Sequence, residues 1–341
     1  MKIYFLSTKK NRHPIDQYLA LWGRIQARNI LPVTYESFIK KKFFPAGLYI
    51  YSDIELLQGS LREEVIRIHQ KLSGENKHYR FLNNPSVTLS RYPLLKNLYD
   101  IGLNSFNVYP LNENYSNARF PVFLRKANDH RGPQTQLLNS VMETEETLAE
   151  LRHKNENLED WMVTEYCHVA GQDGIFRKYA AFIVGETIIP RHVLFGTDWV
   201  QKYPKNMQEL FLSEEIDFFL LNPYENELRR IFKAAGIQYG RIDFGILDGK
   251  IETWEINTNP MIISHSSLTG NGHKNIHKLF FDKFSSVLNT FITTSGPRSS
   301  SISYVPDRAV SLFYRLSQRY RMTKIGHFIQ RLIWRIEKII K

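Results

Sequence analysis

The stretch of residues 241–260, RIDFGILDGKIETWEINTNP, sets polar side chains inside two apolar runs. The runs IDFGIL and IETWEI flank Asp248-Gly249, a dipeptide typical of tight turns, so the stretch predicts a β-hairpin. Asp243, Glu255 and Asn257 lie among Ile, Phe and Trp, where burial of a lone carboxylate is costly. A bound divalent cation would offset that cost, because Asp, Glu and Asn supply the oxygen ligands that Mg²⁺ selects.

The register of this hairpin decides whether the three side chains can act together. A two-residue turn on Asp248-Gly249 would pair Asp243 with Trp254 and send Asp243 to the face opposite Glu255. A three-residue loop, Leu247-Asp248-Gly249 with a G1 bulge, pairs Asp243 with Thr253 and turns the polar side chains to one face. We favour the three-residue loop, with Asp243 diagonal to Glu255.

The pattern D-F-G-x-x-D-G-x-x-x-x-W-E-I-N-x-N-P resembles the metal-binding end of the ATP-grasp superfamily. That resemblance implies that Asp243, Glu255 and Asn257 hold two Mg²⁺ ions, with Mn²⁺ as an alternative, against the phosphates of ATP. It also implies an α+β ATP-grasp fold. The alternative is a solvated hairpin with scattered polar residues.

Composition limits which other classes of protein the sequence could belong to. The chain has 341 residues, a net charge of +11 and one cysteine, Cys167, which excludes an internal disulfide framework and favours a reducing, cytoplasmic setting. Ten Lys and Arg against two acids give residues 298–341 a net charge of +8, so the remainder carries only +3. Basicity confined to one end gives little reason to expect nucleic-acid binding. We see no signal-peptide pattern and no apolar run of transmembrane length.

Alternating strand and helix patterns in the first 80 residues predict a small α/β amino-terminal lobe. The expected organisation is residues 1–80 for this lobe, 81–292 for the ATP-grasp body, and 293–341 for a linker and basic tail. Within the body, helical patterns cover residues 134–151, 214–236 and 274–291.

Nucleotide-binding residues are expected mainly from the resemblance. The run FPVFLRKANDHRG ends a strand with two cations, and the family position for a phosphate-binding lysine falls on Lys126. The next loop has few glycines, so Arg131 is a second candidate for the phosphates. The alternative is a solvated basic turn. The segment WMVTEYCHV resembles the family's adenine-binding connection, which carries over Glu165 and the backbone of Tyr166 and Cys167.

A second hairpin is expected around Gly185-Glu186. A two-residue loop pairs Lys178 with Val193 and Ala180 with Arg191, which turns Lys178 and Arg191 to one side of the sheet. Two cations at that range would repel unless they shared an anion, so we expect a shared anion here. The resemblance to the ATP-grasp superfamily implies that this anion is the triphosphate. The alternative is an edge pair that spreads into solvent.

The function implied by the resemblance is an ATP-dependent ligase that joins a carboxylate to an amine through an acylphosphate, with small-molecule substrates. Two alternatives stay open at this stage: a phosphotransferase acting on a hydroxyl, and a non-catalytic ATP-binding module at a membrane.

The tail adds a separate expectation. From Ile325, apolar residues recur at spacings of three and four, with Lys and Arg mainly off that stripe. This pattern predicts a basic amphipathic helix and a contact through residues 305–341 with a membrane surface, a partner or the body.

Overall fold

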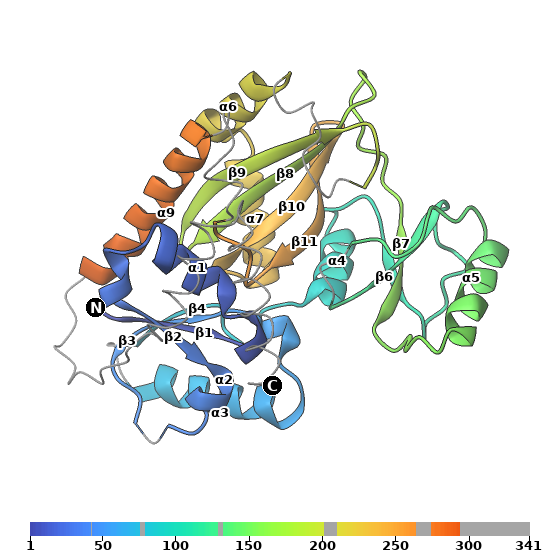
Figure 1. Cartoon of the computed structure of the whole chain (residues 1–341). Helices are drawn as coiled ribbons and strands as arrows, with labels where there is room; N and C mark the ends of the chain where they lie inside the picture. Colours follow the sequence, from blue (N-terminus) through green and yellow to red (C-terminus); the bar gives the residue numbers. More distant parts are fainter. Residues whose placement is uncertain (42, 76–78, 129–131, 201–209, 264–273, 294–341) are drawn as a thin grey trace, which may run out of the picture. The chain divides into compact units, whose positions relative to one another are not determined.

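The computed structural model describes residues 1–41, 43–75, 79–128, 132–200, 210–263 and 274–293. Its contacts divide into two units, each described here by itself (Figure 1). Unit 1 comprises residues 1–53, 57–82 and 259 onward, and unit 2 comprises residues 54–56 and 83–258. The domain limits expected from the sequence, at residues 80 and 292, stay a prediction.

Unit 1 is a parallel α/β layer, as alternating strands and helices favour. Its four-stranded sheet has the order β2-β1-β3-β4, and Ile3 pairs with both Ile30 and Leu48. The elements are β1 (Ile3–Ser7), η1 (Lys9–Asn11), α1 (His13–Leu21), η2 (Gln26–Arg28), β2 (Ile30–Thr34), α2 (Tyr35–Phe38), β3 (Gly47–Tyr51), α3 (Gly59–Glu75), β4 (Tyr79–Leu82) and α9 (Lys274–Thr293). The hydroxyl groups of Tyr18 on α1 and Ser285 on α9 lie 2.7 Å apart, which ties the last helix to this unit.

Unit 2 contains two antiparallel sheets, of order β11-β10-β8-β9 and β5-β7-β6. The elements are η3 (Ile54–Leu56), α4 (Arg91–Asp100), β5 (Val108–Pro110), β6 (Val122–Lys126), α5 (Val141–His153), β7 (Trp161–Glu165), β8 (Phe176–Val184), β9 (Thr187–Gly196), α6 (Leu212–Leu221), α7 (Glu225–Ala235), β10 (Tyr239–Leu247) and β11 (Lys250–Asn257). The larger sheet buries its apolar face against Leu94 and Leu98 of α4 and Ile231 and Phe232 of α7.

One expected helix begins later than its pattern. The helix expected over residues 134–151 starts at Val141, because the backbone of Leu138 pairs with that of Val122 at 2.7 and 2.8 Å. The side chain of Ser140 then caps the helix by accepting a hydrogen bond from the N–H of Glu143 at 3.2 Å. The backbone pairing of Leu138 therefore makes the helix begin later than its amphipathic pattern predicts.

The expected linker after residue 293 and the expected amphipathic tail lie outside the described residues. Within the described part of the chain, no helix is both long enough and apolar enough to cross a membrane.

Candidate functional site

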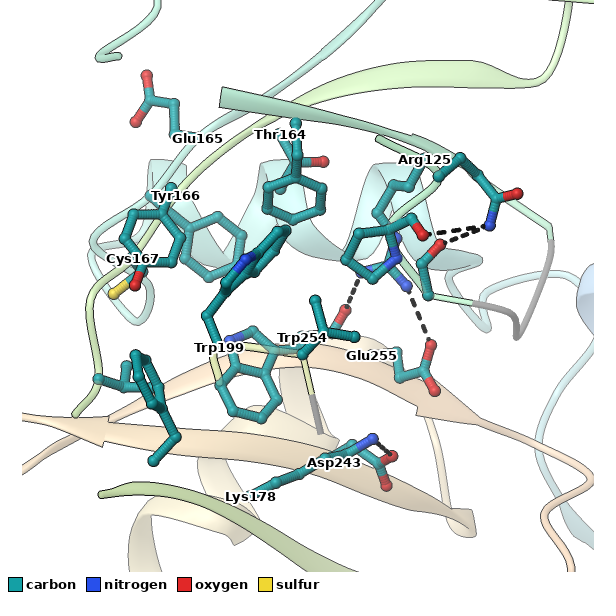
Figure 2. Close-up of a pocket in the computed structure, with 18 of the residues that line it drawn as sticks. Arg125, Thr164, Glu165, Tyr166, Cys167, Lys178, Trp199, Asp243, Trp254 and Glu255 are labelled. Carbon is teal, nitrogen blue, oxygen red and sulfur yellow. Dashed lines mark hydrogen bonds and ion pairs between the residues drawn. The ribbon is translucent and has the colours of Figure 1, made fainter. Parts of the chain in front are cut away.

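The two sheets of unit 2 contribute side chains to one cavity of about 660 Å³. Strands β6 and β7 line it from the smaller sheet, and β8, β10 and β11 line it from the larger sheet (Figure 2). Its walls are of two kinds. One part carries aromatic rings, and the other carries charged side chains from the paired strands.

The expected metal ligands Asp243, Glu255 and Asn257 all line this cavity. Their register differs from the one we favoured. Leu247 pairs with Lys250, so the turn has two residues, Asp248 (φ 49°) and Gly249 (φ 77°), and the three-residue loop is wrong.

A β-bulge further along the hairpin restores a common face for the carboxylates. Asp243 pairs with Glu255 and Phe244 pairs with Thr253, which leaves Trp254 as the extra residue. The two carboxylates therefore lie directly opposite each other rather than diagonally. A bulge next to a site re-aims side chains in this way.

Asp243 is almost completely buried and is held by two cations. Its carboxylate accepts hydrogen bonds from Nε of Arg241 at 2.7 Å and from the second guanidinium nitrogen of Arg241 at 3.1 Å. Nζ of Lys178 lies 2.6 Å from its Oδ2. Burial alone would raise the pKa of Asp243, but the charges of Arg241 and Lys178 outweigh burial and hold that pKa well below its usual range.

Glu255 is held by two further arginines. Its Oε2 accepts hydrogen bonds from Arg91 of α4 and, at 3.2 Å, from Arg125 of β6. Burial would raise the pKa of Glu255, yet the net shift is downward because Arg91 and Arg125 favour the charged form. Around the two carboxylates the described residues thus bring four cations, Arg91, Arg125, Lys178 and Arg241, to two anions.

Lys126 does not face the cavity, whereas Arg125 does. Successive side chains of a strand point to opposite faces, so Phe123 and Arg125 line the cavity while Val122 and Leu124 pack on the other side. Nζ of Lys126 instead lies 3.1 Å from Glu156 and 5.2 Å from the centroid of the Trp161 ring. Arg131, the second expected phosphate ligand, falls outside the described residues.

Glu165, Tyr166 and Cys167 line the aromatic part of the cavity. The Glu165 carboxylate accepts hydrogen bonds from the N–H groups of Asn107 and Arg119 at 3.0 and 2.9 Å and from the Tyr109 hydroxyl at 3.0 Å. These bonds fix the end of β7. Burial raises the pKa of the Cys167 thiol to about 11, so the thiol is protonated at neutral pH and unsuited to nucleophilic chemistry.

Arg191 reaches the charged region by a different register from the expected one. The two-residue loop at Gly185-Glu186 is confirmed, since Val184 pairs with Thr187. Lys178, however, pairs with Leu194 and Ala180 with His192, because Arg191 is an extra residue in a bulge. The predicted pairs Lys178–Val193 and Ala180–Arg191 are therefore wrong by one position.

The bulge leaves Arg191 and His192 close to the other cations. Burial first and the charge of Arg241 second lower the pKa of Arg191 to about 9, although nearby Glu215 opposes the shift. Burial first, and then the charges of Arg191 and Arg241, keep the pKa of His192 well below its ordinary value, so His192 is neutral at pH 7.

Sequence reasoning missed Arg91, Arg125, Arg241 and the aromatic residues Trp199 and Trp254. Arg241 could have been predicted from the strand pattern, since it lies two residues before Asp243 and so shares its face. Trp199 follows β9 and packs against Phe123 and Tyr166, with ring centroids 5.1 and 5.6 Å apart. Nothing in its local sequence signals that contact.

The donor set fits a divalent cation accompanied by a polyanion. Among the described residues, no group of three or more His, Cys, Asp or Glu side chains could hold a metal ion. The candidate set here is two carboxylates and the amide of Asn257, which leaves coordination positions for oxygen atoms of a ligand such as phosphate. Four cations around two carboxylates would complement that ligand's negative charge.

Comparison with known proteins identifies the architecture. No protein-family model matches the chain, and no curated protein sequence matches it. A structure of D-alanine–D-alanine ligase from Bacillus anthracis complexed with ATP aligns at a TM-score of 0.50 and 14% identity, over 86% of this chain and 97% of that chain.

Two further similar structures have lower TM-scores. A RimK domain ATP-grasp protein from Sphaerobacter thermophilus aligns at 0.46 and 13% identity, covering 83% of this chain and 98% of that chain. An L-amino acid ligase from Bacillus licheniformis aligns at 0.40 and 11% identity, covering 87% and 75%. On the first alignment, and on the two-sheet unit that encloses the cavity, the chain has an ATP-grasp fold.

Proposed function

We propose that the chain is an ATP- and Mg²⁺-dependent ligase that joins a carboxylate to an amine. The observation that carries the proposal is the pair Asp243 and Glu255, directly opposite each other in one cavity and surrounded by four cations. A cavity with this charge pattern at one end and aromatic rings at the other complements a nucleoside triphosphate. The similar structure from B. anthracis, a ligase complexed with ATP, supports the same ligand.

The adenine base would bind in the aromatic part of the cavity. Tyr166, Trp199 and Trp254 offer rings for stacking there. The triphosphate would extend toward β8, β10 and β11, where Arg125 and Lys178 lie in the same cavity wall as the carboxylates. Their charge-assisted hydrogen bonds would hold the phosphate oxygens.

Asp243, Glu255 and Asn257 would hold Mg²⁺, two ions in the arrangement we expect. When bound, the ions would neutralise charge on the phosphates. The ionised state of both carboxylates suits this role, because their cationic neighbours already lower their pKa values. Arg241 and Lys178, which are paired with Asp243, line the same cavity and would be available to the phosphates.

The proposed reaction has two displacement steps. An oxygen of the substrate carboxylate forms a bond to the γ-phosphorus of ATP, and the bond from that phosphorus to the β,γ-bridging oxygen breaks, which releases ADP. The acylphosphate carbonyl then accepts the lone pair of an amine, and inorganic phosphate leaves as the amine loses a proton. The chain contributes positioning and cationic stabilisation of the phosphoryl group rather than a covalent nucleophile, consistent with a protonated Cys167.

The test is a screen for ADP and phosphate release with Mg-ATP and pairs drawn from amino acids, peptides and sugar acids, followed by the mass of the product. We expect ADP and free phosphate only when a carboxylate and an amine are both present, with a product that has lost one water. Glu255→Gln should lose about 10²–10⁴ in rate, given how much charge metals neutralise in phosphoryl transfer.

Other outcomes would identify other functions. Phosphate retained on the acceptor would identify a phosphotransferase. Tight ATP binding without turnover for any pair would favour a non-catalytic module.

A further inference from the structure

The amino edge of the unit 1 sheet is the place where the chain enters β1, β2 and β3. Because these strands are parallel, Lys2 and the loops of residues 22–29 and 39–46 emerge at one edge. Backbone hydrogen bonds hold that edge together, from Ile3 N to Asn29 O at 2.8 Å and from Leu48 N to Lys2 O at 3.0 Å. Strands β2 and β3 flank β1, so their first residues are about 10 Å apart.

Two large apolar side chains of this edge are exposed. Ile25, in the loop before β2, is 82% exposed, and Phe43, in the loop before β3, is 62% exposed. Phe43 is not simply a loosely packed core residue. Its neighbour Phe44 packs against Phe38 with ring centroids 5.2 Å apart, which leaves Phe43 as the member of the pair that faces solvent.

The segments that carry these two side chains, together with Lys2, have charge of one sign. Their described residues include Lys2, Arg24, Arg28, Lys40 and Lys41 and no acidic residue, while the segment before the neighbouring strand β4 contains Glu75. Another exposed apolar group of the chain, Leu220 and Leu221 on α6, differs in this respect because Glu214 and Asp217 lie on the same helix. Exposed apolar groups amid uncompensated cations are typical of surfaces that contact anionic lipid.

The last helix of the described structure ends at the same edge. The backbone nitrogen of Met1 donates a hydrogen bond to the carbonyl oxygen of Ile292, near the end of α9. Gln26 of η2 reaches Asn289 of the same helix at 3.3 Å. The described end of α9 therefore lies beside the basic loops.

We propose that this amino edge binds an anionic membrane surface. Ile25 and Phe43 enter the headgroup region, and Lys2, Arg24, Arg28 and Lys40 lie against the acidic headgroups. The contact is made by unit 1 and is independent of the cavity in unit 2.

The experiment is flotation of the full chain with vesicles of phosphatidylcholine alone or mixed with phosphatidylserine. Wild type should float with the mixed vesicles and not with pure phosphatidylcholine, and flotation should weaken as salt rises. Two variants test the edge: Ile25→Ser/Phe43→Ser removes its apolar groups, and Arg24→Glu/Lys40→Glu reverses its charge. Each should lower the partition coefficient about tenfold or more, with an unchanged circular dichroism spectrum.

Two control variants make the same kinds of substitution at positions away from this edge. Ile101→Ser/Met142→Ser removes two apolar side chains that are 53% and 70% exposed in unit 2. Lys9→Glu/Lys10→Glu makes the same charge change at exposed positions of unit 1 that follow the carboxyl end of β1, at the opposite edge of the sheet. Both controls should float like wild type.

Three results would overturn the proposal. In the first, wild type does not float with either vesicle. In the second, the two edge variants float as well as the controls, so the tail binds without the edge. In the third, light scattering shows a dimer that Ile25→Ser/Phe43→Ser dissociates while no flotation occurs, which would assign the surface to a second copy of the chain.

Discussion

At the scale of single residues, the side of a strand decides which of two adjacent cations lines the cavity. Arg125 and Lys126 are neighbours on β6, yet only Arg125 lines the cavity and contacts Glu255. The family pattern located the end of the strand but left its register open by one residue, and a shift of one residue exchanges the two faces. Lys126 therefore stays a prediction, while the geometry favours Arg125 for the phosphate contact.

This difference can be measured with ATP binding by calorimetry. Arg125→Ala should weaken binding by about tenfold or more, because a charge-assisted hydrogen bond to phosphate is worth about 1.5–3 kcal/mol. Lys126→Ala should change it by about threefold at most, since Lys126 makes a half-exposed pair with Glu156. A larger loss of ATP binding in Lys126→Ala than in Arg125→Ala would assign the phosphate contact to Lys126.

A buried histidine in unit 1 gives a prediction on how the stability of the fold depends on pH. His69 is 5% exposed, and its ring lies between Phe81 and Tyr51 with centroids 4.7 and 5.4 Å away. Burial lowers the pKa of His69 in the folded state below its unfolded value of about 6.5. The unfolded state therefore binds a proton first as pH falls, and stability present above about pH 6.5 is lost below it.

The free energy of unfolding of wild type and His69→Gln should be compared from pH 8 to 5 by urea denaturation. His69 should contribute a loss of up to about 1.4 kcal/mol per pH unit in wild type below pH 6.5. The gap between the two proteins should narrow over that range, because the variant lacks this group. A gap that widens on acidification would mean that His69 is charged in the folded state.

At the scale of elements, both hairpins and the positions of both turns were predictable from turn chemistry and alternating patterns. The register was not. In each hairpin one strand carries an extra residue, Trp254 in β11 and Arg191 in β9. A loop of three residues and a bulge have similar effects on the facing of Asp243, so sequence spacing alone could not distinguish them. Packing of Trp254 against Gly245 favours the bulge, because a Cβ at Gly245 would meet the indole at 2.8 Å.

The two-residue turn of the first hairpin makes its own prediction on stability. Both turn residues have positive φ, as a type I′ turn requires, and Gly249 is at 77°. Gly249→Ala should lower the free energy of unfolding by about 1 kcal/mol, because an L side chain disfavours this conformation.

Gly74→Ala is the matched control. Gly74 lies in helix α3, and a methyl group added there would meet no other atom within 4 Å, so the substitution should instead raise stability by about 0.5–1 kcal/mol. Denaturation midpoints of the two variants should move in opposite directions. Equal losses in both would argue against the two-residue turn.

At the scale of the whole molecule, the ATP-grasp fold was predictable from one motif, but the course of the chain was not. The amphipathic pattern of residues 274–291 predicts a helix, and the helix exists as α9. Such a pattern specifies an apolar face and not its partner, so it could not indicate that α9 packs with unit 1. The partner is recognisable only from contacts such as that between Tyr18 and Ser285.

The division into two units predicts which strands ligand binding will stabilise. All side chains lining the cavity belong to residues 106–257, within unit 2. Binding to the folded state alone stabilises it by about 2.7 kcal/mol at a ligand concentration one hundred times Kd. Amide hydrogen exchange of β7, β8, β10 and β11 should therefore slow by up to about a hundredfold with Mg-ATP.

Exchange in strands β1, β2 and β3 of unit 1 should change much less, because none of their side chains lines the cavity. The double variant Asp243→Asn/Glu255→Gln serves as the control and should lose most of the protection by Mg-ATP at the same ligand concentration, since it lacks both carboxylates of the metal set. Comparison of the peptides by mass spectrometry tests each unit separately. Protection of β1–β3 without protection of β10 and β11 would place the nucleotide outside the cavity and contradict the proposed function.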